Sequence, residues 1–180
     1  MFKLVIGFEI YQNRQKLSSY RSKMSKNSPS IELQILGKVE SPFKQKFAIP
    51  RQPGLAPHAK GIIKIEPPFN QSSAFKGLSE FSHIWVSFVF HETMDKGWKP
   101  QVRPPRLGGN DKTGVFATRS TFRPNPLGLS VLKLDKVVLS STNVELHVSG
   151  IDLLDGTPVV DIKPYIPYSD KISSGTVTIF

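Results

Sequence analysis

Two neighbouring stretches decide the fold: "LSVLKLDKVVLSS" (129–141) and "NVELHVSGID" (143–152). In both of them apolar and polar residues alternate, which is the pattern of a strand with one buried face. Only a short turn around Thr142 and Asn143 separates them, so we predict an antiparallel β-hairpin. Further strands are indicated elsewhere in the chain by their own sequence patterns.

The rest of the chain supplies those strands. We predict them in "IELQILGKVES" (31–41), "AKGIIKIEP" (59–67), "SHIWVSFVFH" (82–91), "PVVDIKPY" (158–165) and "GTVTIF" (175–180). Residues 82–91 are apolar enough to be buried on both faces. One short helix is expected in residues 70–78, capped by Ser72 or Ser73 and ending near Gly77. Short strands with little helical periodicity predict a mainly β protein, a β-barrel with few short helices.

Composition limits the class of protein. The chain has 180 residues, 38 % of them hydrophobic, which is enough for one domain with its own core. There is no cysteine, which excludes disulfides and thiolate-bound metals and fits a reducing compartment, so we expect a cytoplasmic protein. No apolar run approaches the roughly 20 residues of a membrane-spanning helix, and no membrane partner is expected.

The ends of the chain differ from its middle. Residues 1–30 mix apolar and basic residues, but Glu9 interrupts the apolar part and no small-residue cleavage site follows, so we do not expect a secretory signal. We expect a leader at 1–30, a barrel domain at 31–170 and a tail at 171–180.

Charge is unevenly distributed. The net charge is +10, with +5 in residues 1–30 and +7 in residues 96–133, against +1 in 31–95 and −3 in 134–180. The second surplus lies inside the domain among prolines and glycines. This favours a polyanionic partner, nucleic acid first; the alternative is an ordinary solvated basic face.

Two long connections carry most of the unusual residues, at 41–60 and 96–114. Connections of that length inside a compact domain are typically functional or disordered. "IPRQPGL" (49–55) holds Arg51 and Gln52 between prolines, which suits a ligand with carboxylate and hydrogen-bonding groups. "RPPRLGGN" (103–110) and "GVFATRSTFRPNPLGLS" (114–130) hold arginines on a stiff backbone, able to bind phosphate or carboxylate in a bidentate manner: Arg103, Arg106, Arg119 and Arg123.

Other familiar sites are absent. There is no phosphate-binding loop of the right spacing and no glycine-rich dinucleotide fingerprint. The four histidines have no metal-ligand spacing, so we expect no metal. Two further features are ambiguous: His91–Glu92 closes an apolar strand, and Asp155–Gly156–Thr157–Pro158 reads as a turn. Each has an ordinary structural interpretation beside a functional one.

Taken together, five segments resemble the TsaA-like family of tRNA methyltransferases, which act on N6-threonylcarbamoyladenosine beside the anticodon. They are "IPRQPGL", "GLSEFSHIWVSFVFH", "VRPPRLGGN", "GVFATRSTFRPNPLGLS" and "DLLDGTPVVDIKPYIPY". The resemblance runs from about Leu33 to Tyr168. It implies a single-sheeted β-barrel that binds S-adenosylmethionine, usually as a homodimer with the cofactor near the subunit interface.

The resemblance also implies positions for the sites. Cofactor contacts are expected at Pro50, Arg51, Gln52, His91, Glu92, Arg119, Leu129, Asp155, Gly156, Thr157 and Pro158. Contacts to tRNA are expected at Arg103, Arg106, Arg123 and Lys163. Bacterial members commonly carry a further C-terminal domain, of which "SSGTVTIF" could be the start.

Transfer of a methyl group to N6 requires that the nitrogen lose a proton, so a base is expected nearby. The candidates are His91, Asp155 and Tyr165, and the sequence does not rank them. Two alternatives to a tRNA methyltransferase stay open. One is a non-catalytic RNA-binding barrel, and the other is a methyltransferase for a small molecule.

Overall fold

The computed structural model describes residues 30–104, 111–141 and 143–176. The chain divides into two compact units. The barrel unit comprises Leu33–His91 and Leu127–Phe180, and the second unit comprises Met1–Glu32 and Glu92–Pro126. We call Glu92–Pro126 the insertion, because it connects two strands of the barrel. The expected leader lies outside the described residues, apart from its last position.

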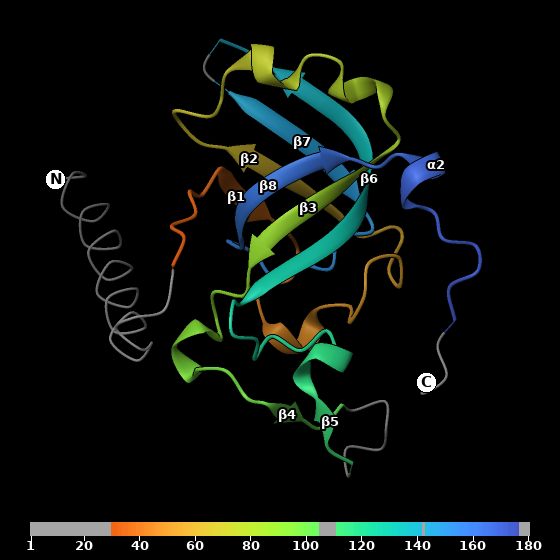
Figure 1. The fold of residues 1–180 in the computed structure, drawn as a ribbon. Coiled ribbons are helices and arrows are strands. Elements are labelled where there is room, and N and C mark those ends of the chain that lie inside the picture. Colours follow the sequence, from red (N-terminus) through yellow and green to blue (C-terminus); the bar gives the residue numbers. More distant parts are fainter. Residues whose placement is uncertain (1–29, 105–110, 142, 177–180) are drawn as a thin grey trace, which may run out of the picture. The chain divides into compact units, whose positions relative to one another are not determined.

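Six antiparallel strands close into a barrel in the order β1-β2-β7-β6-β3-β8, with β8 pairing back to β1 (Figure 1). This confirms the prediction of a mainly β, single-barrel fold. The strands are β1 (Gly37–Glu40), β2 (Lys60–Ile65), β3 (His83–Val89), β6 (Leu127–Leu139), β7 (Val144–Ser149) and β8 (Pro158–Pro164).

The core fills the barrel with the inward residues of these strands. Ile63, Ile84, Leu132 and Leu146 have no exposed surface and come from four different strands. Burying such a side chain contributes about 1.5–3 kcal/mol. In β3 buried residues alternate with half-buried ones, so the expectation that both faces are buried was wrong. A barrel made of a single sheet has an inner face that is packed and an outer face that meets solvent.

Strand β6 joins the two halves of the barrel. Its first part pairs with β3 from Leu127↔Val89 to Lys133↔His83, and its second part pairs with β7. Asp135 is the extra residue of a bulge where the β7 pairing shifts between Leu134 and Lys136. The predicted hairpin of β6 and β7 is therefore confirmed, while Thr142 of its turn lies outside the described residues.

Smaller elements differ from the expectation. Residues 70–78 form two 3-10 helices, Ser72–Phe75 and Leu78–Glu80, rather than one α-helix. The first begins after Gln71, and no side chain caps it. Gly77 lies between them with φ of 84°, a left-handed conformation that ends helical structure at little cost only for glycine. The predicted last strand is absent at positions 175 and 176, and 177–180 lie outside the described residues.

Further 3-10 helices are Lys46–Ala48 in the barrel unit and Met94–Lys96 and Val115–Ala117 in the insertion. The one described α-helix, α2 (Pro167–Asp170), follows β8. The insertion also contains a two-stranded ribbon of β4 (Gln101–Val102) and β5 (Thr113–Gly114).

Candidate functional site

One end of the barrel gathers most of the predicted cofactor segments. The registers Lys38↔Pro158, Phe88↔Val159 and Val89↔Leu127 place the ends of β1 and β3 beside the starts of β8 and β6. The loop from Ser41 to Ala59 leaves β1 at this same end. We call this the cofactor end, because the segments around Arg51, His91, Leu129 and Asp155 all belong to it.

The turn Asp155–Pro158 is rigid. Gly156 has φ of 75°, and its N–H donates to the carbonyl of Val39 at 2.8 Å. Thr157 is only 4 % exposed; its hydroxyl donates to the carbonyl of Leu154 at 2.7 Å. A Cβ at Gly156 would meet nothing within 4 Å, so the outer side of the turn is open for the close approach of a ligand.

The carboxylate of Asp155 ties this turn to the start of the long loop. It accepts a hydrogen bond from the backbone N–H of Ser41 at 3.0 Å, and Lys44 Nζ lies 2.8 Å from its second oxygen. The bond with Lys44, then the bond from Ser41, lower the pKa of Asp155 below its usual value. A carboxylate with a lowered pKa is a weaker proton acceptor at neutral pH. Asp155 is therefore a poor fit for the expected base.

The long loop from Ser41 to Ala59 is anchored where it leaves β1. The hydroxyl of Ser41 donates to the carbonyl of Leu153 at 2.7 Å, and the N–H of Asp155 donates to the carbonyl of Phe43 at 2.9 Å. Further along, Arg51 is exposed and Gln52 is half-buried. The loop therefore presents the exposed side chain of Arg51 from a segment that is anchored to the Asp155 turn.

Two further candidates lie on or after the strands of this end. His91 is half-buried, and its backbone N–H donates to the carbonyl of Val89 at 2.9 Å. Leu129 is paired with Ser87 and is 53 % exposed, so it lies on the outer face of β6. Next to it, the buried hydroxyl of Ser130 donates to Asp152 at 2.8 Å. Both residues lie in segments that resemble the family, but sequence reasoning missed the Ser130–Asp152 pair because a contact across 22 positions depends on how the barrel closes.

Tyr165 and Lys163 lie at the opposite end. The N–H of Tyr165 donates to the carbonyl of His83, the first residue of β3, at 3.0 Å. Lys163 is paired with Trp85 in register and forms an ion pair with Asp161. At about 3.3 Å per residue, the seven residues of β3 separate the two ends by roughly 20 Å. Within one copy of the barrel, the structure does not bring Tyr165 to the other two candidate bases.

The insertion holds the remaining predicted residues, of which Arg106 lies outside the described part of the chain. Glu92, Arg103 and Arg119 are exposed. Arg123 is half-buried, and one of its nitrogens donates to the carbonyls of Val115 at 3.2 Å and Thr118 at 2.7 Å. Arg123 therefore has a structural role in its own loop, which its position in the motif does not reveal.

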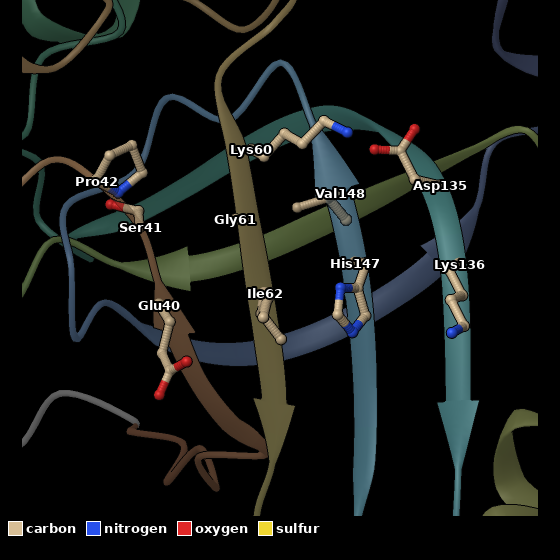
Figure 2. A pocket seen from close by; sticks show the side chains of 10 residues that line it. All are labelled: Glu40, Ser41, Pro42, Lys60, Gly61, Ile62, Asp135, Lys136, His147 and Val148. Carbon is tan, nitrogen blue, oxygen red and sulfur yellow. The ribbon is translucent and has the colours of Figure 1, made fainter.

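A groove of about 590 Å³ crosses the outer face of β1, β2, β7 and β6 (Figure 2). In Figure 2 the ammonium of Lys60 points toward the carboxylate of Asp135, while Ile62 and His147 lie side by side on neighbouring strands. Among the residues that the structure describes, none of those predicted to bind the cofactor lines this groove. Its charges are mixed, and it does not define a ligand class.

Two other kinds of site are absent from the same described ranges. No group of three or more His, Cys, Asp or Glu side chains there is arranged to hold a metal ion. No helix in them has the length and apolar character needed to cross a membrane.

This fold and these segments define a family. Residues 38–171 match the family described as the tRNA-methyltransferase O N-terminal domain. Because the match covers more than half of the chain, the protein belongs to that family, and the resemblance drawn from the sequence motifs is confirmed.

Individual relatives agree with this assignment. The chain is 52 % identical over 149 residues to the Escherichia coli protein named tRNA (adenine(37)-N6)-methyltransferase, covering 83 % of this chain and 63 % of that protein. The crystal structure of TrmO from Pseudomonas aeruginosa superposes with a TM-score of 0.67 at 44 % identity, over 82 % of this chain and 61 % of that one. A Pyrococcus abyssi protein named "Probable S-adenosyl-L-methionine-binding protein" is 39 % identical over 137 residues, covering 75 % of this chain and 68 % of that protein. The chain thus spans about three fifths of the length of the first two.

Proposed function

We propose that this protein is an S-adenosylmethionine-dependent methyltransferase that methylates N6 of an adenosine in tRNA. The observation that carries the proposal is the 52 % identity to the Escherichia coli tRNA (adenine(37)-N6)-methyltransferase across 149 residues. The rigid turn at Asp155 and the anchored loop at Arg51, which belong to the same barrel end, support it.

The residues at the cofactor end fit S-adenosylmethionine. The cofactor carries a carboxylate, an ammonium group and an adenine ring, and it supplies a methyl group bound to a positively charged sulfur. The exposed guanidinium of Arg51 suits the carboxylate. The open backbone at Gly156 suits a planar ring or a hydrogen-bonding edge that must approach closely. We propose that Pro50–Gln52, His91, Leu129 and Asp155–Pro158 contribute to binding, together with Glu92 and Arg119 of the insertion.

In this proposal the protein acts mainly by positioning. Methyl transfer needs the accepting nitrogen held in line with the donor at near-attack distance, and such positioning lowers the barrier substantially. A proton must also leave the nitrogen. We assign its acceptance to His91, because Asp155 has a lowered pKa and Tyr165 lies at the far end of β3. Histidine is also the side chain that most often serves as a general base.

For the substrate we propose tRNA carrying N6-threonylcarbamoyladenosine beside the anticodon. The threonylcarbamoyl group bears a carboxylate, and the insertion contains seven Lys and Arg residues against three Asp and Glu. A guanidinium that pairs with that carboxylate would favour the modified adenosine over the unmodified one. Arg103, Arg106, Arg123 and Lys163 are the proposed contacts to the tRNA backbone.

We further propose a cytoplasmic homodimer. Leu127 and Leu129 of β6 are 38 % and 53 % exposed, and apolar side chains on an outer strand suit burial against a second copy. Sedimentation at micromolar concentration would test this: the unchanged chain should sediment as a dimer and Leu129→Glu as a monomer. A monomeric unchanged chain would contradict the dimer.

The deciding experiment for the function is a methyl-transfer assay with S-adenosylmethionine labelled in its methyl group. We expect label in tRNA that carries the threonylcarbamoyl group and much less in tRNA that lacks it. Equal label in both would contradict the proposed substrate. Salt-sensitive tRNA binding with no transfer and no cofactor binding would instead indicate a non-catalytic RNA-binding barrel, and transfer unaffected by competing tRNA would indicate a small-molecule substrate.

A further inference from the structure

Two large aromatic side chains of the insertion are exposed to solvent. Trp98 is 52 % exposed and Phe116 is 73 % exposed. The ribbon of β4 and β5 brings their segments together: the N–H of Val115, next to Phe116, donates at 3.0 Å to the carbonyl of Pro100, two positions after Trp98. Two exposed rings beside one short ribbon form a local aromatic surface, which differs from a single apolar residue scattered on a surface.

Cations accompany the rings of this segment. Arg123 lies over the ring of Phe116 with its guanidinium carbon 5.6 Å from the centroid, and Lys99 lies over Phe122 at 4.3 Å. The insertion carries seven Lys and Arg against three Asp and Glu, whereas the whole barrel unit carries eleven against nine. The occupant that fits alternating rings and cations is a polyanion with flat groups, which is a description of unpaired nucleic acid.

The surface around Phe116 is preorganised. Arg123 is fixed by its bonds to the carbonyls of Val115, the first residue of the 3-10 helix Val115–Ala117, and of Thr118, which follows that helix. The hydroxyl of Thr118 donates to Val115 at 2.8 Å and accepts the N–H of Ser120 at 3.2 Å. A ring presented by a fixed loop loses little conformational entropy when a ligand stacks on it.

We propose that Phe116 and Trp98 are base-stacking residues for unpaired RNA bases, with Lys99 and Arg123 supplying the positive charge beside them. The inference rests on the proposed function, since it deepens how that function recognises an RNA loop. Stacking of one base on one aromatic ring is typically worth about 1–3 kcal/mol, which corresponds to roughly 5- to 150-fold in affinity.

The test compares two RNA probes: a hairpin with a seven-nucleotide loop, and a blunt duplex of the same stem. Binding of each labelled probe to the full chain is measured at several salt concentrations. Phe116→Leu should weaken hairpin binding at least fivefold and leave duplex binding unchanged, while Phe116→Tyr should bind as the unchanged chain does. The slope of affinity against salt should stay the same in Phe116→Leu, because no phosphate contact is lost, whereas Lys99→Ala should reduce it.

A second readout uses the two tryptophans of the chain. In Trp85→Phe the remaining indole is Trp98, and stacking of a base on it should quench its fluorescence when the hairpin binds. Unchanged affinity of Phe116→Leu together with unquenched Trp98 would overturn the proposal. So would a change from dimer to monomer in Phe116→Leu with RNA affinity intact, which would assign the surface to a contact between copies. Failure of methyl transfer alone, with hairpin binding and quenching intact, would remove the proposed function and leave this inference standing.

Discussion

The carboxylate of Asp155 accepts a hydrogen bond from the backbone N–H of Ser41 at 3.0 Å, although 114 positions separate them in the chain. This bond, with the ion pair to Lys44, connects the turn before β8 to the loop after β1. The Asp155 side chain thus adds to the bonds of Ser41 with Leu153 and of Phe43 with Asp155, which also join these two segments of proposed cofactor contacts.

Replacing Asp155 with Asn should lower stability by about 1 kcal/mol at neutral pH, since the ion pair is partly exposed and screened by solvent. The pKa of Asp155 is lowered in the folded protein, chiefly by Lys44 and then by Ser41. The stabilisation is therefore complete above the carboxylate's ordinary pKa of 3.8 and is lost as pH falls through the lower folded value.

Urea unfolding of both proteins between pH 7 and pH 2.5 checks this. The difference in unfolding free energy should shrink toward zero at the acid end. Asp155→Ala, which also leaves the N–H of Ser41 without its acceptor, should be the less stable variant. A difference that grew on acidification would contradict the assignment.

Gly37→Ala should disrupt the barrel. A Cβ at this position would lie 2.0 Å from the backbone carbonyl oxygen of Lys64 on the neighbouring strand, and backbone held in a sheet cannot move aside. We expect a loss of several kcal/mol or failure to fold, typical of severe overpacking.

Gly114→Ala is the matched control, because a Cβ there would meet nothing within 4 Å and its φ is −58°. It should change the melting temperature by no more than a degree or two. Thermal unfolding followed by circular dichroism measures both variants. Equal stability of the two would show that β1 and β2 approach less closely than described.

Arg123→Ala should loosen the insertion and leave the barrel unchanged. The side chain donates to the carbonyls of Val115 and Thr118, so its loss leaves two acceptors without this donor. Hydrogen exchange followed by mass spectrometry should show faster exchange of the Thr118 amide, which donates to Val115. Exchange in β3 and β6 should not change. If the insertion exchanged at its original rate, the structural role of Arg123 would be refuted.

Arg119→Ala should reduce kcat/KM for methyl transfer by ten- to a hundredfold, the usual cost of one charge-assisted hydrogen bond. Arg119 is exposed, so its removal should not affect folding. Lys112→Ala, also exposed and in the same insertion, is the control and should lose little activity. Transfer that persists undiminished in Arg119→Ala would argue against Arg119 as a cofactor contact.

The sequence allowed the barrel strands to be predicted because their segments either alternate apolar with polar residues, as in β6 and β7, or form a short apolar run, as in β3. β2 lies within its predicted range of 59–67, and β8 within 158–165. The ribbon of β4 and β5 could not be predicted, since strands of two residues have no period. The pairing of Phe88 with Val159 brings the end of β3 beside the start of β8 at the cofactor end. This pairing depends on barrel closure rather than on any local sequence pattern.

For the candidate site, the sequence predicted which types of residue take part but not which of them lie close together. Proline and arginine spacing indicated binding loops, and the family resemblance supplied positions. Neither the spacing nor the resemblance could indicate that Arg123 is bonded to its own loop, or that Tyr165 lies at the far end of β3 from His91. Both facts depend on tertiary contacts, and they change which residues are the best targets for mutation.

The pairing of Val89 with Leu127 has a consequence for how the molecule can vary. These two residues are the last and first strand positions around the insertion, and antiparallel partners lie about 5 Å apart. The pairing of β3 with β6 therefore already holds the two ends of the insertion together. The residues of the insertion are not needed to hold β3 against β6. Such a junction lets a lineage, or a designer, exchange the intervening segment for one of different length and chemistry while the barrel keeps its registers.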